Sequence, residues 1–313
     1  MKIKLFVMLA LCISSIAASS GKAEQYTPDM DNAAGWTIVG SPDTSHQFGF
    51  DYSKYGIPAP PNGGGTTGLW MAANISEGAV ASISASPKDI SMVGDYDVQF
   101  DFYLNFNSSG GTTEFGGGFV GFNPNAGEAF SGGGLLGDTD GDSSRDYRLY
   151  RDTNELAMDS GAYAISSQDN SLDPALQAKF PGQTTPEAQN DSSVFNPTNT
   201  IVTAPNGTLG YAWHTMEINV RNVPCGGFGC PQTAKFSIDD FEIGTIESSA
   251  GLLSNLDGHV AVTFADLFTS VSTKPEFSFG IYDNLTITQV PEPSSALLSL
   301  IGLLGLLGLR KKN

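Results

Sequence analysis

The feature that most constrains the fold is a two-residue alternation of apolar and polar side chains. Residues 98–106 place Val, Phe or Leu at every even position and Gln, Asp, Tyr or Asn at every odd one. Similar alternation occurs in residues 214–220, 236–243, 260–264 and 277–287. Successive side chains of a β-strand point to opposite faces, so each segment predicts a strand with one buried face. Helical periodicity is almost absent between the two ends of the chain, which predicts an all-β body.

Turn signals separate the predicted strands. Asp239-Asp240 lies between two short apolar segments and predicts a two-residue hairpin turn. Three glycine triplets also predict turns: residues 63–65, 116–118 and 132–134. With no internal repeat and no clear linker, residues 24–289 predict a single antiparallel jelly-roll sandwich.

One short helix interrupts this pattern. Asp173 is a suitable N-cap, Pro174 suits the first helical position, and Pro181-Gly182 ends the apolar segment 175–180. The surrounding residues, 166–200, are polar and rich in proline, which predicts a long insertion loop.

The first 23 residues have the three parts of a secretory signal peptide. Lys2 and Lys4 are basic, residues 5–16 are apolar, and residues 17–23 are mostly small. Cleavage after Ser20 or after Ala23 would satisfy the small-residue requirement. We therefore expect the chain to be exported.

The C-terminal end, residues 290–313, combines an apolar segment with a basic end. Residues 296–309 would form a helix of about 21 Å, shorter than the hydrocarbon core of about 30 Å. Basic side chains after the segment can extend to the membrane surface and favour the cytoplasmic side. The pattern predicts a short transmembrane helix that leaves the body outside that membrane.

Pro291, Glu292 and Pro293 precede this segment, and Arg310, Lys311 and Lys312 follow it. Together these parts resemble the PEP-CTERM sorting signal of Gram-negative bacteria. The resemblance implies processing by an exosortase, transient anchoring in the inner membrane, and release to the cell surface, the outer membrane or the extracellular matrix. The alternative is a plain C-terminal membrane anchor.

The body also resembles a known class. Residues 213–220, 234–241 and 279–288 look like the later strands of concanavalin A-like or laminin G-like jelly rolls, and residues 48–58 and 68–74 are similar to segments of exported bacterial proteins of that shape. Asp239-Asp240 stands where such hairpins more often have Asp-Gly. The resemblance implies a fold and does not by itself imply an activity.

Two of the three cysteines remain after removal of the signal peptide, which contains Cys12. Cys225 and Cys230 flank a glycine-rich tetrapeptide, and an exported chain meets an oxidising compartment. We predict a disulfide between them that stabilises the tip of a hairpin.

Residue patterns for catalysis are absent, and we predict no catalytic residue. Asp95 and Asp97 have the alternate spacing of a carboxylate pair, with Asp101 nearby, but Asp is common in a turn before a strand. No Gly-x-Ser-x-Gly motif occurs. His214 lies on the apolar face of its predicted strand, so we expect packing rather than general base catalysis.

The strongest candidate for ligand chemistry is an acidic turn. Alternating carboxylates can converge on one calcium ion, although the segment departs from the EF-hand pattern at its sixth and twelfth positions. The candidate ligands are Asp138, Asp140, Asp142 and Asp146. The alternative is a solvated acidic turn whose charge is neutralised by Arg145, Arg148 and Arg151. No cofactor is expected apart from this candidate calcium ion.

The charge of the chain limits its partners. The formal net charge is −18, and removing both terminal signals leaves nine basic and 32 acidic residues. This balance excludes nucleic-acid binding through phosphate neutralisation.

We expect a non-catalytic surface or matrix protein associated with exopolysaccharide in a biofilm. One alternative is a lectin-like carbohydrate-binding module that uses residues 166–200 and nearby aromatic side chains, with Trp36, Trp70 and Trp213 as stacking or packing residues. A second is a glycoside hydrolase with a degenerate motif.

Overall fold

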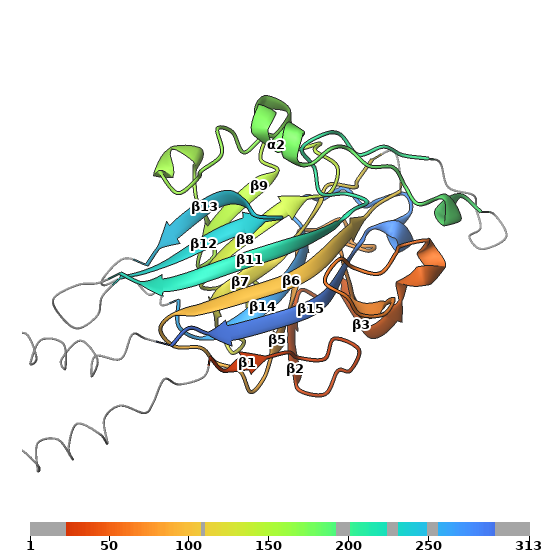
Figure 1. Ribbon diagram of the computed structural model, residues 1–313. Coiled ribbons are helices and arrows are strands. Elements are labelled where there is room, and N and C mark those ends of the chain that lie inside the picture. Colours follow the sequence, from red (N-terminus) through yellow and green to blue (C-terminus); the bar gives the residue numbers. More distant parts are fainter. Residues whose placement is uncertain (1–22, 108–109, 192–200, 224–230, 249–255, 292–313) are drawn as a thin grey trace, which may run out of the picture. The chain divides into compact units, whose positions relative to one another are not determined.

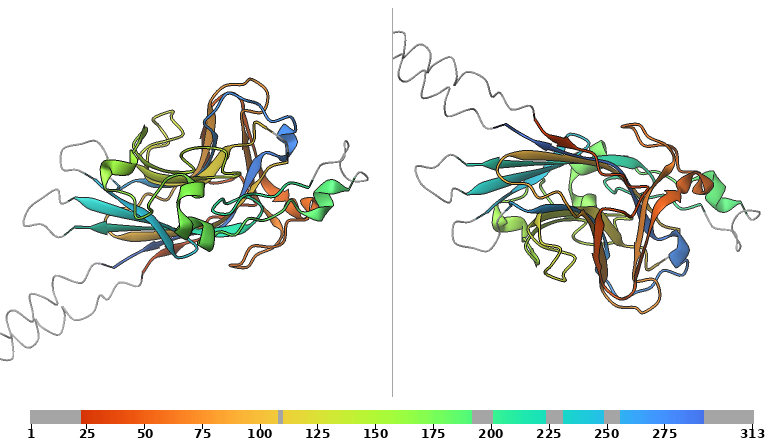
Figure 2. Two further views of the ribbon diagram at one scale, coloured as in Figure 1. Left: turned by 90° about the horizontal axis from the view of Figure 1, so that it is seen from above. Right: turned by 90° about the horizontal axis from the view of Figure 1, so that it is seen from below.

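The computed structural model describes residues 23–107, 110–191, 201–223, 231–248 and 256–291. Within them, two antiparallel sheets pack face to face (Figures 1 and 2), so the prediction of an all-β sandwich is confirmed. The predicted signal and C-terminal helices lie outside the described residues, apart from Ala23. No helix among the described residues has the length and hydrophobicity that a membrane span requires.

The first sheet contains the longest strands. Its order is β13-β12-β11-β6-β15-β4-β3. The bounds of these strands are β3 Thr44–Asp51, β4 Thr67–Ala73, β6 Tyr96–Asn105, β11 Trp213–Asn222, β12 Gln232–Ile238, β13 Phe241–Glu247 and β15 Phe279–Gln289. The chain divides into a body, residues 26–287, and the terminal segments 1–25 and 288–313. The short β1 (Gln25–Tyr26) lies at the division between them.

The second sheet covers the inner face of the first. Its order is β10-β9-β8-β7-β14-β5-β2. Its strands are β2 Trp36–Gly40, β5 Ala81–Pro87, β7 Glu114–Phe122, β8 Gly133–Asp138, β9 Tyr147–Arg151, β10 Asn154–Glu155 and β14 His259–Asp266. The described helices are short: η1 Tyr52–Tyr55, η2 Met158–Ser160, η3 Asn170–Leu172, α2 Pro174–Lys179, η4 Glu187–Asn190 and η5 Pro275–Phe277.

The alternating segments form the strands that they predict. Residues 98–105 lie within β6, and residues 214–220 lie within β11. In this pair of strands Met216 pairs with Phe100. Both side chains are fully buried between the sheets, in the main hydrophobic cluster. The segment predicted to begin at Phe277 starts as a strand at Phe279 instead, because η5 contains Phe277.

The prediction of glycine turns was wrong at residues 116–118 and only partly right at 132–134, where Gly132 alone precedes the strand. Gly116, Gly117 and Gly118 lie within β7, and Gly133 begins β8. A Cβ atom at Gly118 would lie 2.8 Å from the Phe100 ring, and one at Gly117 would overlap the Leu135 carbonyl oxygen. The glycines are therefore required by close packing and not by a turn.

The insertion at 166–200 contributes to the core. Asp173 caps α2 as predicted, since its carboxylate accepts the backbone N–H groups of Ala175 and Leu176 at 2.8 and 3.0 Å. Leu176 and Phe180 are buried in the main cluster, and the Phe180 ring meets His214 edge-on at 5.4 Å. This part of the segment is packed and is not a free loop.

A second apolar cluster lies on the outer face of the first sheet. Tyr52, Ile57 and Tyr103 are buried there, and Trp213 packs against them. Segment 52–65 crosses this face and covers part of it. Outside the apolar cluster, this face carries polar side chains. The groove described below lies at the border between the cluster and these polar side chains.

The predicted hairpin turn at Asp239-Asp240 is confirmed, and its two aspartates differ in their hydrogen-bond partners. Asp239 and Asp240 both have positive φ, 50° and 64°. The Asp239 carboxylate accepts the Thr215 N–H at 2.8 Å and lies 2.7 Å from His214 Nδ1. Asp239 therefore has partners that offset its backbone strain.

We predict that Asp240→Gly raises the free energy of unfolding by roughly 0.5–1 kcal/mol, because relief of the strain exceeds the added entropy of glycine in the unfolded chain. Urea denaturation of the full chain measures this. Asp239→Gly is the matched variant, and it should destabilise the protein through loss of its hydrogen bonds. Equal effects of the two substitutions would contradict the explanation.

Candidate functional site

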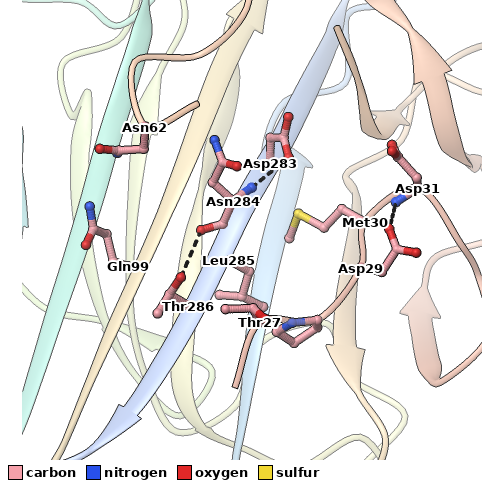
Figure 3. A pocket seen from close by; sticks show the side chains of 11 residues that line it. Thr27, Asp29, Met30, Asp31, Asn62, Gln99, Asp283, Asn284, Leu285 and Thr286 are labelled. Atoms are coloured by element: carbon pink, nitrogen blue, oxygen red, sulfur yellow. Dashed lines mark hydrogen bonds between the residues drawn. The ribbon is translucent and has the colours of Figure 1, made fainter. Parts of the chain in front are cut away.

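A polar groove of about 360 Å³ lies on the outer face of the first sheet (Figure 3). Strands β6 and β15 form its floor, residues 27–31 form one wall, and Asn62 forms the other. Its lining is dominated by carboxylate, amide and hydroxyl groups, from Thr27, Asp29, Asp31, Asn62, Gln99, Asp283, Asn284 and Thr286. We call this the polar groove.

A buried carboxylate holds the Asn62 wall in place. Asp101 is fully buried on β6, and its Oδ1 accepts hydrogen bonds from Asn62 Nδ2 and Thr215 Oγ1, both at 2.7 Å. Its Oδ2 accepts one from Asn284 Nδ2 at 2.8 Å, and the same amide also donates to the Gly63 carbonyl at 2.9 Å. Asp101 is thus a positioning residue that joins three strands to the loop.

The opposite wall is fixed by local hydrogen bonds. The Asp29 carboxylate accepts the Asp31 N–H at 2.9 Å, and the Asp31 carboxylate accepts the Thr67 hydroxyl at 2.9 Å. The Trp36 indole N–H donates to the Asp29 carbonyl at 2.9 Å. The wall therefore keeps its shape without a ligand.

The groove has a negative electrostatic character. Asp29, Asp31 and Asp283 line it, and no Lys or Arg is among the lining residues that the structure describes. Burial, together with the nearby charges of Asp31 and Asp101, raises the pKa of Asp283 to about 6. Asp283 also accepts the Tyr52 hydroxyl at 3.3 Å, which ties the groove to the segment that covers the outer face.

Gln99 offers a free hydrogen-bonding group on the floor of the groove. Its amide has no side-chain partner among the described residues, whereas Asp101 and Asn284 are both engaged. An amide supplies two donors and one acceptor, so together with the carboxylates it can bind a ligand that carries several hydroxyl groups. Among the lining residues there is no His or Cys to act as a nucleophile or base.

The carboxylates considered for catalysis form structural contacts. Asp97 accepts Arg221 Nη2 at 2.6 Å and Asn219 Nδ2 at 2.8 Å, while Asp95 accepts the Asn222 N–H at 2.7 Å. His214 is buried beside Asp239, which agrees with the packing expected for it. Burial raises the pKa of the Asp239 carboxyl, but the hydrogen bond and charge of His214 outweigh this and lower it.

The predicted calcium ligands separate into two groups. Asp138 and Asp146 are fully buried, and burial, together with the nearby negative charge of Asp146, raises the pKa of Asp138. Burial also raises the pKa of Asp146 to about 6, and its Oδ2 accepts the Asn170 N–H at 2.7 Å. Because two buried negative charges repel each other, we expect this carboxyl pair to bind one proton more tightly than an exposed aspartate does.

The other two aspartates point elsewhere. Asp140 accepts the Thr112 hydroxyl at 2.7 Å, and Asp142 lies at the surface. Arg145 and Arg148 form salt bridges with Glu155, at 3.0 and 2.8 Å, and not with the aspartates. Within the described ranges, no three His, Cys, Asp or Glu side chains are grouped as metal ligands. The calcium site remains a prediction.

Several predicted residues lie outside the described part of the chain. Among them are both cysteines of the expected disulfide, Cys225 and Cys230, which therefore stays a prediction. Pro291 is the last described residue and is exposed. The other sorting residues also lie outside: Glu292, Pro293, Arg310, Lys311 and Lys312.

Comparison with known proteins identifies the C-terminal signal. Residues 289–312 match the PEP-CTERM protein-sorting motif, which confirms the resemblance found in the sequence. No curated protein sequence matches the chain. The protein is therefore an exported protein with a PEP-CTERM sorting motif and a β-sandwich body.

Similar solved structures include lectin and polysaccharide-degrading domains. The exoplasmic/lumenal domain of VIP36, in a Ca²⁺/Man2-bound form, is 9% identical, with 88% of this chain and 94% of that chain covered and a TM-score of 0.41. The endo-1,3-β-glucanase from Streptomyces sioyaensis is 13% identical, with 88% and 99% covered and a TM-score of 0.38. The endo-β-1,4-glucuronan lyase from the fungus Trichoderma reesei is 12% identical, with 87% and 93% covered and a TM-score of 0.37. At these values the similarity carries no statement about ligand or activity.

The shared proton of Asp138 and Asp146 gives a pH dependence with a defined sign. The folded-state pKa of Asp146, about 6, exceeds its ordinary value of 3.8. The folded protein therefore binds this proton more tightly than the unfolded chain does, and the contribution of the pair to the unfolding free energy rises as the pH falls from about 7 to about 4. Asp146→Asn should mimic the protonated pair, since its amide can donate to Asp138.

We predict a melting temperature about 2–4 °C higher for Asp146→Asn than for the unsubstituted protein at pH 7.5, and a smaller difference at pH 5. Thermal unfolding with and without millimolar calcium measures both this effect and the calcium prediction. If calcium stabilises the unsubstituted protein at pH 7.5 and Asp146→Asn abolishes that gain, the pair binds metal and does not simply share a proton.

Proposed function

We propose that this protein is a non-catalytic component of the cell surface or extracellular matrix that binds exopolysaccharide through the polar groove. In this proposal an exosortase processes the chain at residues 291–293. The apolar segment 296–309 anchors the precursor in the inner membrane until then. The body, a lectin-like jelly roll, is the part delivered to the cell surface, the outer membrane or the matrix of a biofilm.

The groove is the observation that carries the proposal. Its walls are held by hydrogen bonds within the protein, so it is formed before a ligand binds. The Gln99 amide on its floor has no side-chain partner among the described residues, and acceptor carboxylates lie around it. Preformed clefts with a few oriented polar groups are typical of small-molecule and sugar sites.

The negative charge of the groove indicates which class of polysaccharide it can bind. Three carboxylates and no basic side chain line it, so an anionic polymer would be repelled unless cations intervened. Neutral polysaccharides carry hydroxyl groups that can donate to Asp29, Asp31 and Asp283. We therefore propose a neutral polysaccharide as the ligand.

The absence of catalysis is part of the proposal. A glycosidase needs one carboxyl group that transfers a proton and a second carboxylate across the scissile bond. Asp101, which is fully buried beside the groove, has both oxygens occupied by hydrogen bonds from protein side chains. Such a group is suited to holding the site together and not to attacking a substrate.

The sorting part of the proposal is tested by replacing Pro291, Glu292 and Pro293 with alanine. We expect the full-length precursor to accumulate in the inner membrane, because the apolar segment and basic end still anchor it. Membrane fractionation and immunoblotting measure this. Unchanged processing and release would instead favour a plain anchor cleaved by another route.

The binding part is tested with Gln99→Ala in the full chain. Removing a ligand hydrogen bond of about 0.5–1.5 kcal/mol should weaken binding to a neutral β-glucan about two- to tenfold. Thr233→Ala, on β12 of the same sheet but outside the groove, is the matched control and should bind normally. Affinity electrophoresis in gels that contain laminarin measures the affinity, and gels that contain alginate test the anionic class.

Two results would contradict this proposal. One is normal laminarin binding by Gln99→Ala. The other is tighter binding of alginate than of laminarin without added cations, since the carboxylates of the groove disfavour an anionic chain.

A further inference from the structure

A second pocket, of about 290 Å³, lies on the outer face of the first sheet beside β3 and β4. Three of its lining residues are aromatic, namely Phe50, Tyr55 and Trp70. The others are three apolar residues, Ala72, Ile75 and Pro275, and two polar ones, Gln47 and Glu276. We call this the aromatic pocket. It shares no lining residue with the polar groove.

The rings of the aromatic pocket support one another. Phe50 lies 5.8 Å from Trp70 and 5.5 Å from Tyr55, measured between ring centroids. The buried ring of Phe279 contacts all three, at 5.3 to 6.2 Å. A register shift in β3 between Gln47 and Phe50 accompanies this arrangement. The surface that the rings present is therefore rigid, which lowers the entropic cost of stacking a ligand on it.

Trp70 differs from the other two tryptophans. The indole N–H groups of Trp36 and Trp213 donate to the carbonyl oxygens of Asp29 and Pro58, at 2.9 and 2.7 Å. Trp70 is half-buried, and its N–H has no hydrogen-bond partner among the described residues. A core tryptophan normally satisfies this donor. The Trp70 N–H is not among the buried polar atoms that lack a partner, so it is open to solvent or to a ligand beside the apolar ring face.

We propose that the aromatic pocket binds one pyranose ring of a neutral, β-linked polysaccharide. The apolar C–H face of the sugar stacks on the aromatic rings. Its hydroxyl groups bond to Gln47, Glu276 and the Trp70 N–H. A volume of about 290 Å³ is near the lower end of small-molecule pockets, roughly 300–1,000 Å³, which suits one ring and not a chain.

This inference rests on the proposed function, because it adds a stacking site, the aromatic pocket, to the hydrogen-bonding site in the polar groove. The two sites are joined through the covering segment 52–65: Tyr52 donates to Asp283 of the groove, Asn62 lines the groove, and Tyr55 lines the aromatic pocket. A polymer that occupies both sites gains from their combination, since the second contact is intramolecular. A lone lipid or peptide side chain would not need the polar rim.

The test uses the full chain, with cellohexaose as the probe and calorimetry as the measurement. We expect Trp70→Ala to weaken binding about tenfold, and Trp70→Phe to lose less because it keeps a stacking ring. Gln47→Ala, an exposed rim change that leaves the rings intact, should weaken binding about two- to fivefold. Phe268→Ala, which removes an exposed aromatic side chain elsewhere, is the matched control.

A second measurement does not depend on the stability of the variants. Cellohexaose should protect the unsubstituted protein from fluorescence quenching by acrylamide, because Trp70 is the tryptophan that the sugar covers. Trp70→Phe should lose this protection while it still binds. Protection that persists in Trp70→Phe would overturn the assignment of the stacking residue.

The combination of variants separates this inference from the proposed function. Normal binding by Trp70→Ala and Gln47→Ala, with weak binding by Gln99→Ala, overturns the aromatic pocket alone. The reverse pattern supports the aromatic pocket and overturns the role of the polar groove. If the unsubstituted protein binds neither cellohexaose nor laminarin, both proposals fail.

Discussion

The close approach of the two sheets at the glycines of β7 is the constraint on which the rest of the structure depends. Phe100 and Leu104 on the inner face of β6 occupy the space that side chains at Gly118 and Gly116 would need. This packing fixes β6 in position and orientation. The opposite face of the same strand carries Gln99 and Asp101, so the floor of the polar groove is as fixed as the core beneath it.

The sequence allowed prediction of features that depend on local periodicity. The alternation of residues 98–106, the hairpin at Asp239-Asp240 and the capped helix after Asp173 all concern neighbours along the chain. Considered locally, the glycines of β7 predict a turn. Their role is to leave space for the side chains of β6, and no local pattern reveals that contact. The sorting motif was recognisable because its parts are contiguous.

The polar groove could not be predicted for the same reason. Asn62, Gln99 and Asp283 come from three distant segments, and the only signal that each carries is a polar residue in a loop or on the outward face of a strand. The acidic turn shows how spacing along the chain differs from contacts in the fold. Asp140 and Asp142 look like ligands because they alternate in sequence, whereas Asp146 finds its partner in Asn170, which lies in the insertion.

The insertion itself limits how the body can be altered. Phe180 closes one end of the core over Tyr147 and His214, with ring centroids 6.2 and 5.4 Å away. A shortened protein that keeps every strand but lacks this segment would expose these rings to solvent and leave Asp146 without a donor from Asn170. The smallest unit that can evolve, be transplanted or be fused to another sorting signal is therefore the sandwich together with its insertion.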